Sequence, residues 1–445
     1  MSGIAGIAQP GMVAQVESMV AKLTHRGPKQ IKIIETSTAT LGVASRDQET
    51  VELLAQQNLA LDARGGLHCA QAQASERGVQ LKRDRLGVAP LYYGTLPEGE
   101  MAFASEVKAL LPLTREVREL PPGHTLEDSK LEPYYQLKRQ PELEIGFDDC
   151  KRVLRDRLET AVEKRIGDGD VGAWLSGGLD SSTLAALVRP HIQTLYTFAA
   201  GVEGADDLMY AQQVADYLDS NHYEVIVTLP DMLAVLPEVI YHLESFDAWL
   251  VRSSITNYLV AKRAADFVPA VFSGEGGDEL FAGYEYLKEI APDSLADELI
   301  DITGRLHNTA LQRVDRCASA HGTIAYVGFL DANVVDWAFH IPVAYKMNGG
   351  VEKWILRQAV ADLLPEAVTF RPKVKFWQGA GVAEQIAEYA AQQISDSEFE
   401  HERKLANGWR LNSKEELYYY HIFQEHFGNL DDLSWVGRTK GSPVS

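Results

Sequence analysis

One short segment constrains the fold of this chain more than any other, because it joins a predicted strand directly to a predicted helix through glycine and serine. The apolar run 171–175 predicts a buried strand, and residues 179–188 predict a helix. The connection and the first helical turn consist of Leu175, Ser176, Gly177, Gly178, Leu179, Asp180, Ser181 and Ser182. A helix that begins at the end of a strand points its N–H groups and its positive end at one spot, and glycines let an anion come close. The segment therefore predicts a phosphate-binding loop.

The aspartate in this loop indicates which phosphate ligand it suits. A carboxylate repels a bare phosphate, and a bridging Mg²⁺ at Asp180 removes that conflict, which favours pyrophosphate with magnesium over a simple anion. No Gly-Lys-Ser/Thr ending follows, so the segment is not a Walker loop. An SGGxDS sequence resembles the loop of enzymes that cleave ATP between its α and β phosphates. The alternative is a serine–glycine turn that only caps a helix.

A second glycine-rich loop follows the later apolar run 269–272. It contains Ser273, Gly274, Glu275, Gly276, Gly277 and Asp278. Glycines among acids at the carboxyl end of a strand are typical of a ligand crevice in an open α/β sheet. We expect Asp278 to share the magnesium ion with Asp180. The alternative is an acidic surface turn.

Strand-like and helix-like segments alternate through the middle of the chain. Predicted buried strands are Val171–Leu175, Leu195–Ala200, His222–Val227 and Pro269–Phe272, and predicted helices are Phe147–Ile166, Leu179–Val188, Asp206–Asp219, Asp231–His242 and Ser254–Ala265. This alternation predicts an α/β fold with a doubly wound parallel sheet. From about residue 290 onward the pattern is mostly helical. We expect residues 146–445 to form this domain.

The first part of the chain has a different pattern, with short alternating segments separated by turns. Expected strands are Ile31–Glu35, Thr40–Ala44, Leu59–Ala63 and Leu91–Gly94. The polar stretch 138–146 marks the predicted boundary. We therefore expect residues 1–140 to form a separate β-rich domain.

Composition excludes several functional classes. The 445 residues include 42 Lys and Arg against 63 Asp and Glu, a net charge of −21, so nucleic acid is not expected as a partner. No apolar run approaches the roughly 20 residues that span a bilayer, so no membrane association is expected. The cysteines Cys69, Cys150 and Cys317 are far apart, which fits neither a disulfide framework nor a zinc site. With no signal peptide in view, a cytoplasmic location is expected.

The two loops resemble those of glutamine-dependent asparagine synthetases, and the resemblance covers nearly the whole chain. Further similar segments are 197–201, 239–247, 328–331, 352–357 and 371–373, together with 1–4, 25–28, 83–87, 104–108 and 121–123 in the first domain. The resemblance implies an N-terminal sandwich of the Ntn-hydrolase type, here shortened, before an ATP pyrophosphatase domain.

The resemblance also implies a reaction and its cofactors, ATP and Mg²⁺. A carboxylate attacks the α-phosphate of ATP to give an acyl-adenylate, and ammonia or an amine then displaces AMP. Asp180 and Asp278 would hold Mg²⁺, Lys373 would neutralise developing charge, and Glu275 would take a proton from the amine. The implied ATP and pyrophosphate contacts are Leu175, Ser176, Gly177, Gly178, Asp180, Ser181, Ser182, Ala200, Ser273 and Gly274.

The first domain departs from the family at its glutaminase site. Ser2 replaces the nucleophilic cysteine, Asp62-Ala63 replaces the Asn-Gly pair of the oxyanion hole, and the glutamine-binding aspartate segment falls in a deletion between Cys69 and Lys82. Arg46 matches the glutamine-binding arginine, and Lys29 stands where the family has an aspartate. We expect this domain to be an inactive relic without glutaminase activity.

The pocket for the acid substrate departs as well. Trp249 and Leu250 replace two threonines, whereas Arg252 is kept to hold an anion, and Tyr326 lies in another altered segment. We expect an acid that is larger or less polar than aspartate near its reacting end. The alternative is that Trp249 and Tyr326 are ordinary aromatic residues of the hydrophobic core and do not line the pocket.

The leading hypothesis is an AMP-forming amide ligase that joins a small-molecule carboxylic acid to ammonia or an amine. Three alternatives stay open: intramolecular closure of the β-lactam synthetase type, ammonia-dependent asparagine synthesis, and a non-catalytic nucleotide-binding homologue. Glu275 favours amidation because the cyclising branch usually has tyrosine there, whereas Tyr326 keeps cyclisation open. A tRNA-thiolating enzyme with this loop would show paired cysteines and a basic surface. A homodimer is kept open as the assembly.

Overall fold

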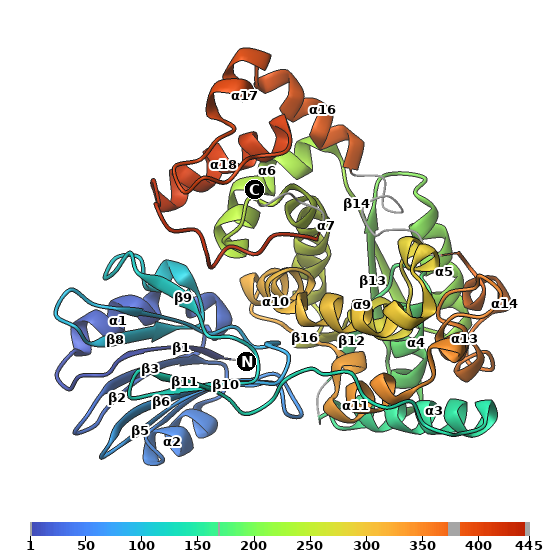
Figure 1. Ribbon diagram of the computed structural model, residues 1–445, viewed down its shortest axis with the longest axis horizontal. Coiled ribbons are helices and arrows are strands. Elements are labelled where there is room, and N and C mark those ends of the chain that lie inside the picture. The colour runs from blue at the N-terminus through green and yellow to red at the C-terminus, as the bar shows by residue number, and fades with distance from the viewer. Residues whose placement is uncertain (1, 168–169, 373–382, 441–445) are drawn as a thin grey trace.

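The structure is a computed structural model that describes residues 2–167, 170–372 and 383–440. Its N-terminal part contains two antiparallel sheets (Figure 1). The first has the order β2-β3-β1-β8-β7-β9 and the second the order β11-β10-β6-β5-β4. Their bounds are β1 Ser2–Ile7, β2 Gln30–Glu35, β3 Thr40–Ser45, β4 Leu59–Ala63, β5 Cys69–Ser75, β6 Gly78–Arg83, β7 Tyr92–Thr95, β8 Met101–Ala104, β9 Val117–Glu119, β10 His124–Glu127 and β11 Lys130–Pro133, with helices α1 Val13–Ala21 and α2 Gln48–Gln56.

Burial along these strands shows how the two sheets form a sandwich. Strands β5 and β6 alternate between buried and half-buried residues, so each presents one face to the core. Strands β1 and β3 are buried at every position, which means that both of their faces are covered. Ile4, Leu41 and Phe103 of the first sheet share a core with Ala72 and Leu81 of the second. The β-rich expectation for this region is confirmed.

The second part of the chain is built on a five-stranded sheet with the order β14-β13-β12-β15-β16, in which every pair is parallel. The strands are β12 Val171–Trp174, β13 Tyr196–Gly201, β14 Asn221–Ile226, β15 Ala270–Phe272 and β16 Ile324–Tyr326. The central strands β12 and β15 are wholly buried, as their continuous apolar runs predict. The doubly wound α/β fold is confirmed.

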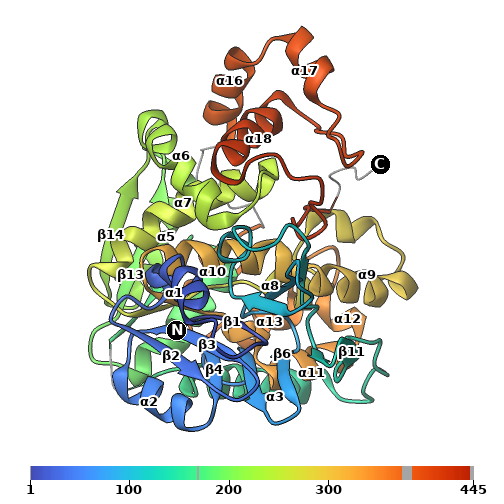
Figure 2. The same ribbon diagram turned by 90° about the vertical axis from the view of Figure 1, so that its left-hand side faces the viewer.

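Helices cover this sheet and extend beyond it. They are α3 Phe147–Glu163, α4 Leu179–Val188, α5 Asp206–Tyr217, α6 Leu229–Leu243, α7 Ala248–Ala265, α8 Gly277–Phe281, α9 Pro292–Gly304, α10 Ala310–Ala320, α11 Ala332–His340, α12 Val343–Lys346, α13 Trp354–Ala359, α14 Glu366–Thr369, α16 Ala383–Gln393, α17 Asp396–Glu402 and α18 Lys414–Phe427. Both views place α16, α17 and α18 together at one end of the molecule, beside α6 (Figures 1 and 2). Among the described residues, no helix is long and apolar enough to cross a membrane.

Two features differ from the sequence-based expectation. Strand β16 lies in the region expected to be mostly helical, and its three residues are too few to show a periodic pattern. Helix α7 begins at Ala248, six residues before the predicted start, because Asp247 caps it by accepting a hydrogen bond from the Leu250 N–H (3.0 Å). Residues 134–146, between β11 and α3, contain no helix or strand.

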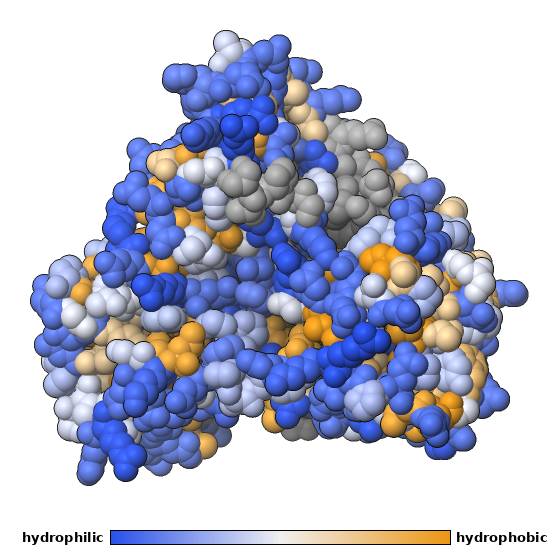
Figure 3. Space-filling model, in the orientation of Figure 1, coloured by the Kyte–Doolittle hydropathy of each residue, from blue (hydrophilic) through white to orange (hydrophobic). Residues whose placement is uncertain are grey.

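The surface and the core show how the two parts adhere. The face in Figure 3 is mostly hydrophilic, with its hydrophobic side chains in small separate groups. One apolar core continues from α1 and β1 into the parallel sheet, through residues such as Ile7, Val16, Trp174 and Phe198. The N-terminal sandwich is therefore packed firmly against the second part of the chain.

Candidate active site

The crevice lies where the strand order of the parallel sheet reverses. From β12 the chain proceeds to β13 and β14 on one side, and β15 and β16 lie on the other side. The loops after β12 and β15 therefore leave neighbouring strands in opposite directions. In open α/β sheets this switch point is where ligands bind, outside the carboxyl ends of the strands.

Serine hydroxyl groups fix the shape of the first loop. The Ser181 hydroxyl accepts a hydrogen bond from the Ser176 N–H (3.2 Å), and the two hydroxyl oxygens lie 3.1 Å apart. Gly177 has φ +66° and approaches α5 so closely that a Cβ there would lie 2.4 Å from the Tyr210 Cβ. Only glycine meets both requirements without strain. Ser182 is fully buried in α4, and its hydroxyl has no partner among the described residues.

The second loop touches the first directly. A Cβ on Gly274 would lie 2.8 Å from the Ser181 nitrogen, and one on Gly277 would lie 2.5 Å from the Asp180 Cγ. Glycine at these positions lets the two loops meet without side chains between them. Ser273 is buried, and its N–H donates to the Tyr326 carbonyl (2.9 Å), which fixes the start of the loop to β16.

The expected meeting of Asp180 and Asp278 is present, with a lysine between them. The Nζ atom of Lys353 lies 2.5 Å from Asp180 Oδ2 and 2.6 Å from Asp278 Oδ1. Lys353 is 2% exposed, and its backbone adopts the left-handed conformation with φ +55° and ψ +29°. Sequence reasoning assigned it no role, although it stands in the family-like segment 352–357. The sequence held one signal that could have pointed to Lys353, namely an ionisable residue directly before an apolar helical segment.

A cavity adjoins the two loops, and three cationic residues are part of its lining. It is lined by Ser176, Gly178, Leu179, Asp180, Ser181, Asp207, Lys353, Arg357, Arg371 and Pro372. Arg371 donates to Asp207 (2.8 Å) and stacks over the ring of Tyr210, 4.0 Å from its centroid. These contacts hold a guanidinium group beside the loop, where it can neutralise phosphate charge.

Two acids of the second loop have partners of their own. Glu275 forms an ion pair with Arg313 of α10, and this pairing and the Glu275 charge raise the pKa of the buried Arg313 guanidinium despite its desolvation. Glu279 accepts a hydrogen bond from the Tyr284 hydroxyl. Burial, followed by the neighbouring Asp278, raises the pKa of Glu279 to about 7. Glu275 therefore lies in the loop with its carboxylate held by a fixed cation.

The residues predicted for the acid pocket are spread over several environments. Trp249, near the start of α7, is 37% exposed, whereas Leu250 is buried. The Arg252 Nε donates to Glu415 of α18 (2.6 Å), so its guanidinium pairs with a carboxylate of the protein itself. Tyr326 lies on β16 against Phe272 and close to Gly65 of the N-terminal part.

The remaining predicted residues fall at the edges of the site. Leu175 donates its N–H to the Phe198 carbonyl (2.8 Å), which ties the loop to β13. Ala200 is buried near the carboxyl end of β13. Lys373 lies outside the described residues.

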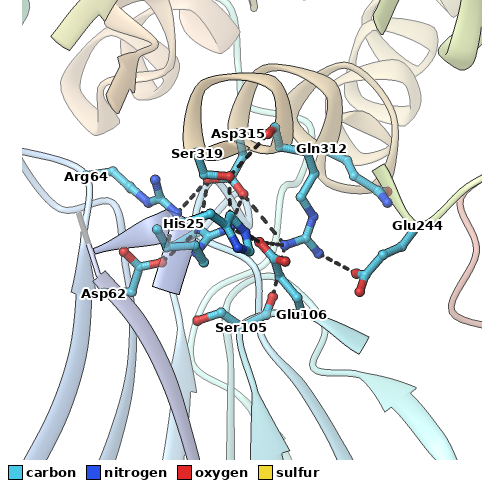
Figure 4. Close-up of polar contacts among 12 residues, drawn as sticks. His25, Asp62, Arg64, Ser105, Glu106, Glu244, Gln312, Asp315 and Ser319 are labelled. Atoms are coloured by element: carbon cyan, nitrogen blue, oxygen red, sulfur yellow. Dashed lines mark hydrogen bonds and ion pairs between the residues drawn. The ribbon is translucent and has the colours of Figure 1, made fainter. Parts of the chain in front are cut away.

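A second group of buried charges lies where the N-terminal sandwich meets α10 and the end of α6 (Figure 4). We call it the interface cluster; its members are Arg26, Asp62, Arg64, Glu106, Lys108, Glu244, Asp315 and Arg316. Arg26 is fully buried and reaches Asp62 (3.2 Å) on its own side and Asp315 (3.0 Å) on the other. The four cations and four anions named here balance.

One member of the interface cluster, Asp62, stands where the family resemblance places part of a glutaminase site. The Ser2 N–H donates to Asp62 Oδ1 (3.1 Å), and the other Asp62 oxygen lies 2.8 Å from an Arg64 nitrogen. Asp62 is fully buried, and burial raises its pKa to about 7. Arg46 donates to the Pro269 carbonyl at the start of β15 (3.3 Å). These side chains therefore bind other parts of the protein.

Comparison with known proteins agrees with this architecture. The asparagine synthase family matches residues 153–301 and 291–440, and the glutamine amidotransferase domain matches residues 60–159. The chain is 35% identical to the glutamine-hydrolyzing asparagine synthetase B of Escherichia coli, over 82% of this chain and 71% of that enzyme. It is 33% identical to the Gallus gallus enzyme, with coverage of 81% and 72%, and 33% identical to asparagine synthetase 2 of Arabidopsis thaliana, with coverage of 78% and 64%. The chain belongs to the asparagine synthase family of ATP-dependent ligases.

Proposed function

We propose that this protein is an AMP-forming amide ligase that adenylates a carboxylic acid and transfers the acyl group to ammonia or a substrate amine. In this proposal residues 146–445 carry the chemistry and residues 1–140 do not hydrolyse glutamine. The observation that carries it is the convergence of Asp180 and Asp278 beside a cavity walled by Arg357 and Arg371. Two convergent carboxylates next to cations suit a metal-bound pyrophosphate.

The loop residues bind and orient the nucleotide. The Gly178 N–H, at the start of α4, and the hydroxyls of Ser176 and Ser181 line the cavity and are suited to pyrophosphate oxygens. The carboxylate oxygens of Asp180 and Asp278 are the donors that Mg²⁺ prefers, so the pair fits that ion. When bound, magnesium supplies charge stabilisation for the leaving pyrophosphate.

Glu275 is proposed to receive the proton of the attacking amine. An amine must be unprotonated to attack, and a carboxylate in the second loop lies on the crevice side of the sheet. Pairing with Arg313 orients the Glu275 carboxylate. Lys373 is kept as the proposed stabiliser of charge on the phosphate or the tetrahedral centre.

Absence of glutaminase activity is proposed from the interface cluster. Acyl transfer needs N–H donors aimed at an oxyanion. Here a buried carboxyl, Asp62, stands at the oxyanion position and is engaged by the Ser2 N–H and by two arginines. The serine hydroxyl itself lies 3.5 Å from the Ser45 hydroxyl, in a site that is 5% exposed at Ser2.

The acid is proposed to be larger or less polar than aspartate. Of the two altered residues on α7, Leu250 is buried and the Trp249 indole is partly exposed, whereas the retained Arg252 pairs with Glu415. An exposed indole favours a substrate that stacks on it. Small polar acids lose the two hydroxyl contacts that threonines would provide, each worth about 0.5–1.5 kcal/mol.

ATP–pyrophosphate exchange across a panel of amino acids and small carboxylic acids tests this function. We expect exchange with an acid larger than aspartate and none without an acid, and chromatography should show AMP and no ADP. Trp249→Ala should raise the KM for the best acid. ADP as the main product, or exchange with no acid in the panel, would contradict the proposal.

The amine is identified next by offering ammonia and amines to the enzyme with the best acid. An acid that forms its own internal amide without any added amine would indicate the intramolecular alternative. Aspartate with ammonia as the best pair would indicate asparagine synthesis.

A further inference from the structure

Lys353 has a backbone conformation that its surroundings must impose. It precedes α13 with φ +55° and ψ +29°, a region that residues with a side chain rarely adopt. Such conformations persist only where neighbouring structure determines them, and they gather at functional sites. The conformation directs this side chain into the crevice between two loops from other parts of the sequence.

The path of the side chain is kept clear by glycine. A Cβ on Gly283 would lie 2.2 Å from the Lys353 Cε and 2.1 Å from Asp278 Oδ1. No larger residue at 283 leaves space for the lysine beside Asp278. Gly283 therefore leaves room for the Lys353 side chain, whose ammonium group lies between Asp180 and Asp278.

The Lys353 ammonium group occupies the position that a divalent cation bound by both carboxylates needs. The Lys353 Nζ lies 2.5 Å from Asp180 Oδ2 and 2.6 Å from Asp278 Oδ1. An ion that both carboxylates bind must take the place of the ammonium group, because one space between these oxygens cannot hold two cations. The lysine brings one positive charge to two carboxylates, whereas a divalent ion brings two.

The displaced ammonium group has somewhere to go. Lys353 lines the same cavity as Ser176, Ser181 and Arg371, which is where the proposed function places the phosphates of ATP. A lysine ammonium is a compact charge on a flexible stem and binds phosphate well. Phosphate oxygens in the cavity would give Lys353 a new partner at the moment it loses the two carboxylates.

We propose that Lys353 is an exchangeable counter-ion. Its ammonium group neutralises Asp180 and Asp278 until a divalent cation binds together with the nucleotide. The ammonium group then moves away from the two carboxylates and pairs with the phosphates. This inference rests on the proposed function. It implies that metal and nucleotide bind together. A metal ion that binds alone must displace the Lys353 ammonium group while no phosphate is present to pair with that group. By linkage, each ligand increases the affinity for the other to the same extent.

Binding of Mn²⁺, followed through the electron paramagnetic resonance signal of the free ion, tests this inference without any turnover. We expect the wild type to bind Mn²⁺ weakly alone and much more tightly with a non-hydrolysable ATP analogue. Lys353→Met should bind Mn²⁺ alone at least roughly tenfold more tightly than the wild type, because the competing cation is gone. Lys262→Met, which removes an exposed lysine of α7, is the matched control and should behave as the wild type. Equal affinity of Lys353→Met and wild type for free Mn²⁺ would overturn the inference.

Thermal melting with and without Mn²⁺ covers the case in which the variant is unstable. Removing the ammonium group leaves two carboxylates without its charge, so we expect a lowered midpoint that Mn²⁺ restores in Lys353→Met and in Lys353→Gln. If neither variant is stabilised by Mn²⁺ more than the wild type, the inference is wrong. A wild type that binds no ATP analogue under any condition would contradict the proposed function instead, and the two failures are thus distinguishable.

Discussion

Two groups of charges among the described residues, the interface cluster and a group in the crevice, differ in almost every respect. The interface cluster joins four cations to four anions across the contact between the N-terminal sandwich and α6 and α10 (Figure 4). The crevice group consists of Asp180, Asp278 and Lys353, borders a cavity and is surrounded by glycines. The interface cluster lies within the contact between two parts of the protein, whereas the crevice group borders a cavity that has room for a ligand.

This difference supports the proposal that residues 146–445 carry the chemistry. A buried ion pair stabilises little relative to apolar packing, but breaking it by removing one partner is strongly destabilising. The interface cluster therefore fixes how the two parts meet. In the crevice, by contrast, the charges adjoin a cavity, where the proposed function places a metal ion and phosphates.

The largest expected effect is on catalysis in the crevice. Asp180→Asn and Asp278→Asn each keep the side-chain shape and remove a charge that we assign to magnesium. Each should lower the rate of ATP–pyrophosphate exchange by roughly 10²–10³-fold with little loss of folded protein. Asp336→Asn is the control, since Asp336 pairs with Arg85 at an exposed position. Exchange within threefold of the wild type would remove both residues from the proposed site.

The next effect is on stability at the interface cluster. Arg26→Gln leaves Glu106 and Asp315 buried without the cation whose pKa they raise. We expect the free energy of unfolding to fall by about 3–5 kcal/mol. Urea denaturation measures it, with Arg85→Gln as the exposed control at about 0–1 kcal/mol. An equal loss of unfolding free energy in the two variants would show that the interface cluster does not hold the two parts of the protein together.

A buried cation outside both groups sharpens the contrast. Lys346 is 2% exposed beside a cavity that Glu142, Leu299 and Phe339 also line. Desolvation lowers its pKa from 10.5 to about 7, although Glu142 opposes the shift. Because the folded pKa is the lower one, the unfolded chain binds more protons between pH 7 and 10.5, and stability rises with pH in that window.

Lys346→Met removes this dependence. At pH 7 the variant should be more stable than the wild type by up to about 4 kcal/mol, and the advantage should fade as the pH approaches 10. Denaturant unfolding at several pH values measures the difference, and Lys138→Met, at an exposed position, should show none. A variant that is less stable at every pH would mean that Lys346 is paired rather than merely buried.

Local pattern and one topological rule were enough to predict the crevice from the sequence. The apolar runs 171–175 and 269–272 predict parallel strands, and the carboxyl ends of neighbouring parallel strands bring Asp180 and Asp278 together. Lys353 was missed because it is 173 residues from Asp180 and no periodicity connects them. The partners of Arg26 were missed for the same reason, since Asp315 is 289 residues away.

The smallest expected effect is on glutaminase activity, which we expect a single substitution not to restore. Ser2→Cys restores the nucleophile of the related glutaminases, yet we expect no glutamate release from glutamine above the wild-type level. The Ser2 N–H already donates to Asp62, the residue that we propose stands in place of an oxyanion donor. Arg26 and Arg64 hold that carboxyl in place from the other side, so on our proposal a thiol alone does not restore the donors that an oxyanion needs. A glutamate dehydrogenase-coupled assay measures the product, with Ser2→Ala as the control. Glutamate release by Ser2→Cys, with none by Ser2→Ala, would contradict this prediction. It would show that glutamine can still be hydrolysed beside the interface cluster, so that both charged groups would belong to active sites.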